Sequence, residues 1–177
     1  MSFMRYETYT AAIAPALDTV VRHRDDGPAT WFLNGLMTVK ASNADTGGAY
    51  CLMEHVLTPA GSPPPHVQTD EEEAFYVIDG EIEFEVEGQV VLARAGTFAL
   101  VPRGATHTFR VLTETARTLV ISSAGRGGQA PGGGLERFFQ SVGTPATSHT
   151  LPVPAAPDPV ALTAAAADHG IVILPPG

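Results

Sequence analysis

Three polar residues within a short stretch of the chain are of types that bind metal ions or take part in acid–base chemistry. His66 and Gln68 are two residues apart, and Glu73 follows them at the end of an acidic run, in the sequence GSPPPHVQTDEEEAFYVIDG (residues 61–80). On a strand, residues two apart share a face, so His66 and Gln68 point the same way. A polar turn over residues 69–72 would let the next strand present Glu73 beside them.

A further histidine comes from far along the chain. His107 ends the sequence GTFALVPRGATH (residues 96–107), 41 residues after His66, and so must arrive on a different strand. Two imidazoles and a carboxylate are a common ligand set for first-row transition metals, and they leave coordination positions for a ligand or for oxygen. The alternative is that the acidic run is only a charged turn and that the two histidines are unrelated.

The elements that would position these residues are predicted to be short strands. Segments rich in β-branched and aromatic residues alternate with turn residues, which is typical of a sandwich or a barrel. The predicted strands cover residues 30–41, with Gly35 as a bulge or break, and residues 49–57, 73–79, 81–88, 89–94, 97–101, 107–112 and 117–122. In the sequence EIEFEVEG (residues 81–88), the acidic side chains face water and the apolar ones face the core.

The sequence changes character after residue 124. A glycine-rich linker is followed by a predicted helix over residues 135–143, a proline-rich segment, a second helix that begins at Asp158-Pro159 and ends at Gly170, and a last strand over residues 171–174. We therefore divide the chain into an N-terminal arm (residues 1–29), a barrel (residues 30–124) and a C-terminal extension (residues 125–177) of Gly/Pro-rich linkers with two short helices packing on the barrel.

Composition restricts the partners. Ten basic and nineteen acidic residues give a net charge of −9, which disfavours nucleic acid and anionic membrane surfaces. Cys51 is the single cysteine, so an intrachain disulfide is excluded and a reducing cytoplasm is expected. The N-terminal residues lack the pattern of a signal peptide, and there is no apolar run of about 18 residues. We expect a cytoplasmic protein that acts on a small molecule.

The first stretch resembles the first motif of the cupin superfamily. That motif has a glycine, then His-x-His, a glutamate and, after six further residues, a glycine. The matching positions here are Gly61, His66, Gln68, Glu73 and Gly80. The spacing from Gly61 to His66 is one residue shorter than in the common form, and Gln68 stands where the second histidine is usual.

The second stretch is similar to the second cupin motif. The matching positions are Gly96, Pro102, Gly104 and His107, and Val111 stands where an asparagine often closes the motif. The sequence GLERFFQSVGTP, followed by a proline-rich stretch and a helix ending in HGIVILPPG, is similar to single-domain cupins often labelled quercetin 2,3-dioxygenase-like.

The resemblance implies an all-β fold, a cupin-type jelly-roll barrel with a C-terminal helical extension and a metal in the barrel mouth. By motif match the metal ligands are His66, Gln68, Glu73 and His107, and the metal is a divalent transition metal (Fe, Ni, Mn, Co or Zn). Gln68 leaves three alternatives open. Its carbonyl ligates the metal, or it orients a water or the substrate beside a two-histidine, one-carboxylate site, or the site has lost its metal.

The implied function is that of a metal-dependent oxidoreductase, a dioxygenase acting on a flavonol-like, aromatic or polyketide enol, with Glu73 as the catalytic group that accepts the enol proton. The alternatives are a cupin isomerase, cyclase or lyase that uses the metal as a Lewis acid, and a metal-free small-molecule-binding cupin. A homodimer is expected by analogy. Inward-facing residues that would bind substrate, or else pack in the core, are Met53, His55, Phe75, Val77 and Phe109.

Overall fold

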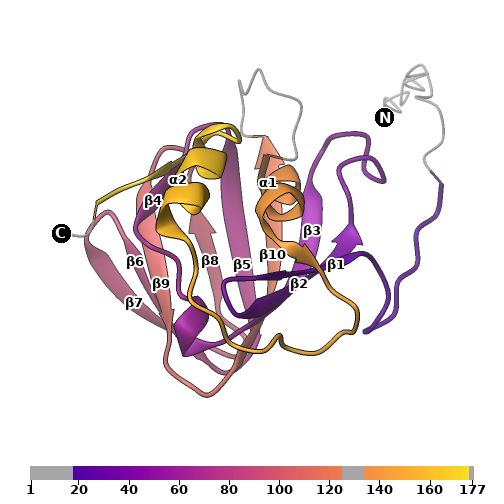
Figure 1. The fold of residues 1–177 in the computed structure, drawn as a ribbon, viewed down its shortest axis with the longest axis horizontal. Helices are drawn as coiled ribbons and strands as arrows, with labels where there is room; N and C mark the ends of the chain where they lie inside the picture. The colour runs from indigo at the N-terminus through magenta and orange to yellow at the C-terminus, as the bar shows by residue number, and fades with distance from the viewer. Residues whose placement is uncertain (1–17, 125–133, 176–177) are drawn as a thin grey trace, which may run out of the picture.

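The structure, a computed structural model, describes residues 18–124 and 134–175. Within these residues the chain forms two antiparallel sheets and two α-helices (Figure 1). The predicted all-β fold is therefore confirmed. Neither helix is long and apolar enough to cross a membrane. Residues 1–17 of the predicted arm and most of the glycine-rich linker lie outside the described residues.

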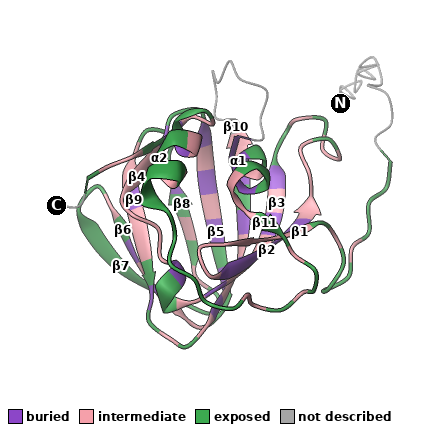
Figure 2. Ribbon diagram, viewed as in Figure 1, coloured by how far each residue is buried: buried purple, intermediate pink, exposed green. Residues whose placement is uncertain are grey.

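The two sheets face each other and enclose the core between them (Figures 1 and 2). The larger sheet has the strand order β11 (Thr144–Pro145), β1 (Ala29–Phe32), β2 (Gly35–Ala41), β3 (Cys51–Leu57), β10 (Ala116–Ala124), β5 (Glu71–Asp79) and β8 (Phe98–Val101). The smaller sheet has the order β12 (Ile171–Ile173), β4 (His66–Gln68), β9 (Thr106–Val111), β6 (Glu81–Val86) and β7 (Gln89–Arg94).

An aromatic cluster joins the two sheets. Phe75 of the larger sheet packs against Phe84 and Phe109 of the smaller sheet, with ring centroids 5.1 and 6.2 Å away. Phe84 and Ile82 are buried, as the alternation in β6 predicted. Aromatic pairs of this kind contribute about 0.5–1.5 kcal/mol beyond the area they bury, so the cluster helps to hold the sheets together directly beneath the candidate site.

The segment predicted as one strand over residues 30–41 is two strands. Phe32 pairs with Gly35, and the two residues between them, Leu33 and Asn34, have positive φ angles of 44° and 60°. This is the geometry of a two-residue hairpin turn of type I′, for which Asn-Gly is the usual sequence signal. Here the two central residues are Leu33 and Asn34, and Gly35 is the first residue of β2. The break that we expected at Gly35 therefore lies just before it and reverses the chain.

The acidic run is also different from the prediction. The polar turn was expected over residues 69–72, but β5 already begins at Glu71, and the side chain of Glu71 is buried. Its carboxylate accepts hydrogen bonds from the backbone N–H groups of Gly134 and Leu135 and from the hydroxyl of Ser122. These bonds offset the desolvation of the carboxylate, which is why it is tolerated inside.

The C-terminal extension covers part of the barrel with two helices and adds strands to both sheets. Helix α1 (Gly134–Val142) begins where the backbone N–H groups of Gly134 and Leu135 donate to Glu71. Helix α2 (Pro159–Ala167) follows Asp158, whose Oδ1 accepts hydrogen bonds from two backbone N–H groups. The helices contact each other, and β11 and β12 extend the sheets (Figure 1). The barrel therefore includes residues beyond the boundary at residue 124 that we expected.

Candidate metal centre

The pairing of β4 with β9 brings two of the predicted ligands side by side. His66 and His107 are direct partners in this pair, and their ring centroids are 4.1 Å apart. Glu73 faces them from β5 in the opposite sheet, where alternation turns residues 71, 73 and 75 inward. A turn after β4 was predicted to bring Glu73 beside His66, and the observed turn does so, although it spans only Thr69-Asp70.

The three side chains lie close enough to share one ion. Nε2 of His107 is 3.0 Å from Oε2 of Glu73, and one candidate ligand atom from each of the three residues lies within 4.8 Å of the others. Glu73 and His107 are 5% and 2% exposed. Two imidazoles and a carboxylate in this arrangement could hold a first-row transition metal.

Backbone carbonyl groups fix the orientation of both imidazoles. Nδ1 of His66 donates to the carbonyl oxygen of Pro64, and Nδ1 of His107 donates to that of Ala105, each over 3.0 Å. A carbonyl oxygen only accepts, so the proton at each Nδ1 is fixed. Nε2 is then the nitrogen that each ring turns toward the site, which is the usual arrangement behind a metal-binding histidine.

The buried charges shift one another's pKa values. Burial alone would raise the pKa of Glu73, but the hydrogen bond and the charge of His107, with smaller effects of His66 and His55, bring it below its ordinary value. Burial lowers the pKa of His107, but its hydrogen bond to Glu73 and the charge of Glu73 outweigh this and raise it. The pKa of His66 is lowered by burial and by the charge of His107.

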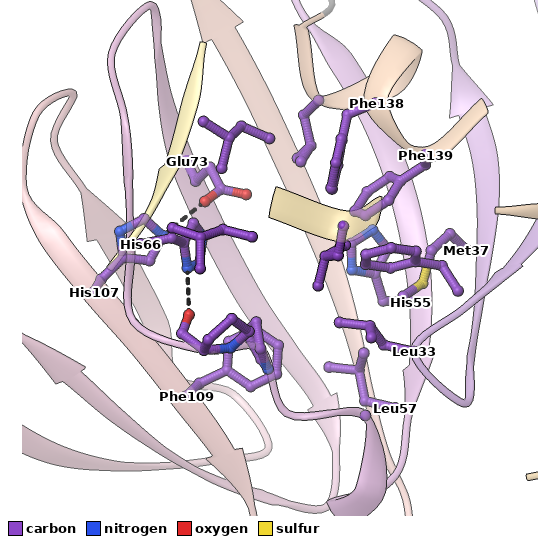
Figure 3. A pocket seen from close by; sticks show the side chains of 18 of the residues that line it. Leu33, Met37, His55, Leu57, His66, Glu73, His107, Phe109, Phe138 and Phe139 are labelled. Atoms are coloured by element: carbon purple, nitrogen blue, oxygen red, sulfur yellow. Dashed lines mark hydrogen bonds and ion pairs between the residues drawn. The ribbon is translucent and has the colours of Figure 1, made fainter. Parts of the chain in front are cut away.

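The three residues lie at one side of a cavity of about 70 Å³ (Figure 3). Apart from them and one further histidine, the cavity is lined by apolar side chains and by glycine and proline. Several of these come from the C-terminal extension: Leu135, Phe138, Phe139, Leu162, Ile171 and Ile173. The extension therefore closes the part of the barrel in which the candidate ligands lie.

The structure brings some of the predicted substrate-binding residues to this cavity and not others. His55, Phe75 and Phe109 line it. Met53 and Val77 do not, and both are 1% exposed within the core. Both face inward as predicted, but Met53 is paired between Val39 and Val120 in the middle of the larger sheet. Val77 lies four residues beyond Glu73 on β5. Alternation along a strand predicts which side chains face the core, but it does not predict which of these line a cavity.

His55 lies across the cavity from the candidate ligands (Figure 3). It is 4% exposed, its ring packs edge-on against Phe139, and its Nε2 is buried with no hydrogen-bond partner. Burial lowers the pKa of His55 to about 4, against a smaller opposing effect of Glu73. At neutral pH this imidazole is therefore uncharged and has a free polar atom.

Gln68 has an unpaired hydrogen-bond donor next to the candidate ligands. It is 4% exposed on the same face of β4 as His66, and its Nε2 is buried without a hydrogen-bond partner. Its side chain is not among those that line the cavity. A buried amide N–H group without an acceptor costs free energy, and the oxygen of a coordinated water or of a substrate group near His66 would supply one. The two imidazoles and the carboxylate fit a bound divalent metal, and the unpaired amide fits an oxygen atom bound beside it.

Sequence reasoning missed two groups of residues. Leu135, Phe138 and Phe139 were assigned to a helix but not to the cavity, and their apolar helical spacing gave no sign of what they cover. Leu33 was placed in a strand, and an Asn-Gly turn at Asn34 and Gly35 would also have left it at a strand end, because the observed turn lies one residue earlier.

Comparison with known proteins agrees with this geometry. Residues 53–122 match the cupin domain family. Quercetin 2,3-dioxygenase of Bacillus subtilis (strain 168) is 32% identical over 108 residues, which are 59% of this chain and 31% of that protein. The chain thus spans about a third of the length of this curated relative.

A solved structure has the same fold. The crystal structure of a predicted oxalate decarboxylase from Thermotoga maritima superposes with a TM-score of 0.54 at 21% sequence identity, covering 60% of this chain and 99% of the other. At this identity the likeness supports the fold alone. The domain match and the two facing sheets agree: residues 53–122 of this chain form a cupin domain.

Proposed function

We propose that this protein is a metal-dependent cupin enzyme, and specifically a dioxygenase that acts on a flavonol-like, aromatic or polyketide-type enol. The observation that carries the proposal is the group of His66, Glu73 and His107 at the side of an otherwise apolar cavity. The similarity to a quercetin 2,3-dioxygenase over 108 residues supports the choice of reaction.

His66, Glu73 and His107 would hold the metal, with Gln68 as a fourth ligand or as a partner of a coordinated group. When bound, a divalent metal lowers the pKa of a coordinated hydroxyl and stabilises the negative charge of an enolate. Iron, nickel, manganese, cobalt and zinc all suit two imidazoles and a carboxylate.

Glu73 is the residue best suited to accept the enol proton. Its lowered pKa keeps the carboxylate ionised at neutral pH, despite its burial. In this step the O–H bond of the substrate breaks, the proton bonds to a carboxylate oxygen of Glu73, and the electron pair stays on the enolate oxygen. In the metal-free protein, Nε2 of His107, 3.0 Å away, stabilises this carboxylate.

The remaining walls would bind and orient the substrate. Phe75 and Phe109 offer aromatic surface next to the ligand group, and the apolar lining excludes water from the reacting atoms. His55 faces the ligand group as an uncharged imidazole, and its unpaired Nε2 can form a hydrogen bond with a polar substituent of the substrate.

Oxygen uptake by metal-loaded protein in the presence of quercetin tests this proposal. We expect uptake coupled to loss of quercetin, and a loss of rate of at least about 100-fold in Glu73→Gln, the usual range for a catalytic acid–base group. Glu72→Gln, the next residue on β5, should react at the wild-type rate. Absence of uptake in fully loaded protein would overturn the dioxygenase assignment. Enol conversion without oxygen uptake would favour the isomerase, cyclase or lyase alternative.

A further inference from the structure

We propose that the substrate of this site is elongated, and that its distal, uncharged part binds in a second and larger groove next to the metal cavity. This inference rests on the proposed function, because it extends the same site outward. The groove would select the substrate, which would be a planar hydroxylated molecule longer than one ring.

The metal cavity is too small to hold such a substrate alone. Its volume is about 70 Å³, whereas a cavity of about 150 Å³ is known to hold one benzene ring, and pockets for larger organic ligands measure about 300–1,000 Å³. Only the reacting edge of an aromatic enol fits beside His66, Glu73 and His107. The rest of the molecule has to lie elsewhere.

A groove of about 930 Å³ lies next to this cavity. It is bordered by the β1–β2 turn, the end of α1, the proline-rich segment over residues 144–158, and α2. In Figure 1 this segment runs as a long arc from β11 to α2. Two hydrogen bonds tie the arc to the barrel: Trp31 Nε1 donates to the carbonyl oxygen of Thr150, and the backbone N–H of Ala155 donates to Oδ1 of Asn34, each over 2.8 Å.

The two spaces share three lining residues, Phe32, Leu33 and Leu162. A side chain that lines both spaces lies between them, so these three form the partition. Phe32 packs against Phe138 and Phe139 of the cavity wall. A ligand held at the candidate metal ligands therefore enters the groove as soon as the partition side chains move aside.

Leu33 occupies an unfavourable backbone conformation at this partition. Its φ angle is 44°, which costs a residue with a side chain about 1 kcal/mol or more and favours glycine or asparagine. The turn is held on both sides, because Asn34 bonds to Ala155 and to the carbonyl oxygen of Ala60. The backbone of Gly61 also approaches the carbonyl oxygen of Leu33 so closely that a side chain would not fit. The turn thus fixes an apolar side chain at the boundary between the two spaces.

The lining of the groove indicates what binds there. The hydroxyls of Ser148 and Thr150, whose oxygens are 2.7 Å apart, can exchange their mutual hydrogen bond for bonds to substrate hydroxyls, and most of the remaining lining is apolar. Asp158 is the one charged side chain among the lining residues, and its Oδ1 already accepts two backbone N–H groups of α2. Because the lining offers no cation, a phosphorylated or otherwise anionic tail is disfavoured, and an uncharged hydroxylated ring is favoured.

Binding of two probes of different length tests this inference. Quercetin is the long probe, and acetohydroxamate is a small chelating probe. Each is titrated into metal-loaded protein and its affinity is measured by calorimetry. Oxygen is left out, so that binding is measured without turnover. Ala161→Trp fills the groove from α2. Ala164→Trp is the matched control, since Ala164 is exposed on the same helix and lines neither space.

We expect Ala161→Trp to weaken quercetin binding at least tenfold and to leave acetohydroxamate within twofold, while Ala164→Trp changes neither. Leu33→Gly is expected to fold, because glycine adopts positive φ readily. Removing the partition side chain should accelerate quercetin association, measured by stopped-flow mixing without oxygen, at least fivefold without changing that of acetohydroxamate.

The outcomes separate this inference from the proposed function. Equal effects of Ala161→Trp on both probes, no effect on quercetin, or failure of quercetin to bind where acetohydroxamate binds would each overturn the groove and leave the metal centre in place. Loss of oxygen uptake with normal quercetin binding would instead overturn the dioxygenase assignment alone.

Discussion

Nε2 of His107 lies 3.0 Å from Oε2 of Glu73 inside the barrel, and both atoms are those that a metal would use. Nδ1 of His107 already donates to the carbonyl oxygen of Ala105. A hydrogen bond from Nε2 to a carboxylate therefore requires protons on both ring nitrogens. Without metal, the pair is an imidazolium and a carboxylate, which agrees with the raised pKa of His107 and the lowered pKa of Glu73.

Metal binding should therefore release a proton. A metal replaces the proton on Nε2 of His107, so about one proton should be released per metal bound near pH 6.5, and the apparent affinity should rise with pH until it passes the raised pKa of His107. Calorimetric titration in two buffers with different ionisation enthalpies measures this number. Binding without proton release would show that His107 is not displaced from its bond to Glu73.

Glu73→Gln should destabilise the metal-free protein by about 3 kcal/mol, because it leaves His107 buried without its anionic partner. The raised pKa of His107 contributes stability that is present below its ordinary value of 6.5 and is lost as the pH rises through the raised value. The lowered pKa of Glu73 contributes stability that is present above 4.5 and is lost as the pH falls through the lowered value.

Both contributions to stability are present between about pH 4.5 and 6.5, so the effect of Glu73→Gln should be largest there. Urea unfolding across pH measures it, with Glu72→Gln as the neighbouring control. An effect that is the same at every pH would contradict the ion pair.

His55→Leu should make the protein less sensitive to acid. The pKa of His55 falls from its ordinary value of 6.5 to about 4 on folding. The unfolded chain therefore takes up a proton before the folded one does, and wild-type stability falls between pH 6.5 and 4 by about 3 kcal/mol from this residue.

The variant with leucine lacks this dependence on His55, and near pH 7.5 it should be as stable as wild type or more so, because Nε2 has no partner to lose. Urea unfolding at pH 4.5 and 7.5 decides the matter. Parallel pH profiles for the two proteins would show that His55 is protonated as easily in the fold as in the unfolded chain.

Gln68→His should tighten metal binding at least tenfold, because imidazole is a stronger donor than an amide for a transition metal. Competition with a chromophoric chelator measures the affinity. Gln68→Asn is the control, since it keeps an amide and adds no nitrogen ligand. If histidine at this position leaves the affinity unchanged, its side chain does not reach the metal, and Gln68 has another role.

The candidate ligands could be predicted from the sequence because local rules position them. His66 and Gln68 share a face by alternation, a short turn reverses the chain before Glu73, and the motif resemblance identified His107 as their partner. Pairing of β4 with β9 then follows from the barrel topology. The homodimer and the cytoplasmic location stay predictions.

What could not be predicted depends on contacts between distant segments. Glu71 looked like part of a charged turn because its partners at the start of α1 are 63 and 64 residues away. The partition at Leu33 and Leu162 and the groove beside it exist only because the proline-rich segment packs back onto the β1–β2 turn. A pattern within one segment of the sequence does not indicate on which distant segment it packs.

Metal content and thermal stability of protein purified without chelators test the central claim most directly. We predict about one transition metal per chain, and a rise in Tm of about 8 °C or more when stripped protein is reloaded at 1,000 times its Kd. His66→Ala and His107→Ala should abolish both effects, and His149→Ala, away from the cavity, should keep them. Metal far below one per chain, with no change in Tm on adding Fe, Ni, Mn, Co or Zn, would contradict the metalloenzyme.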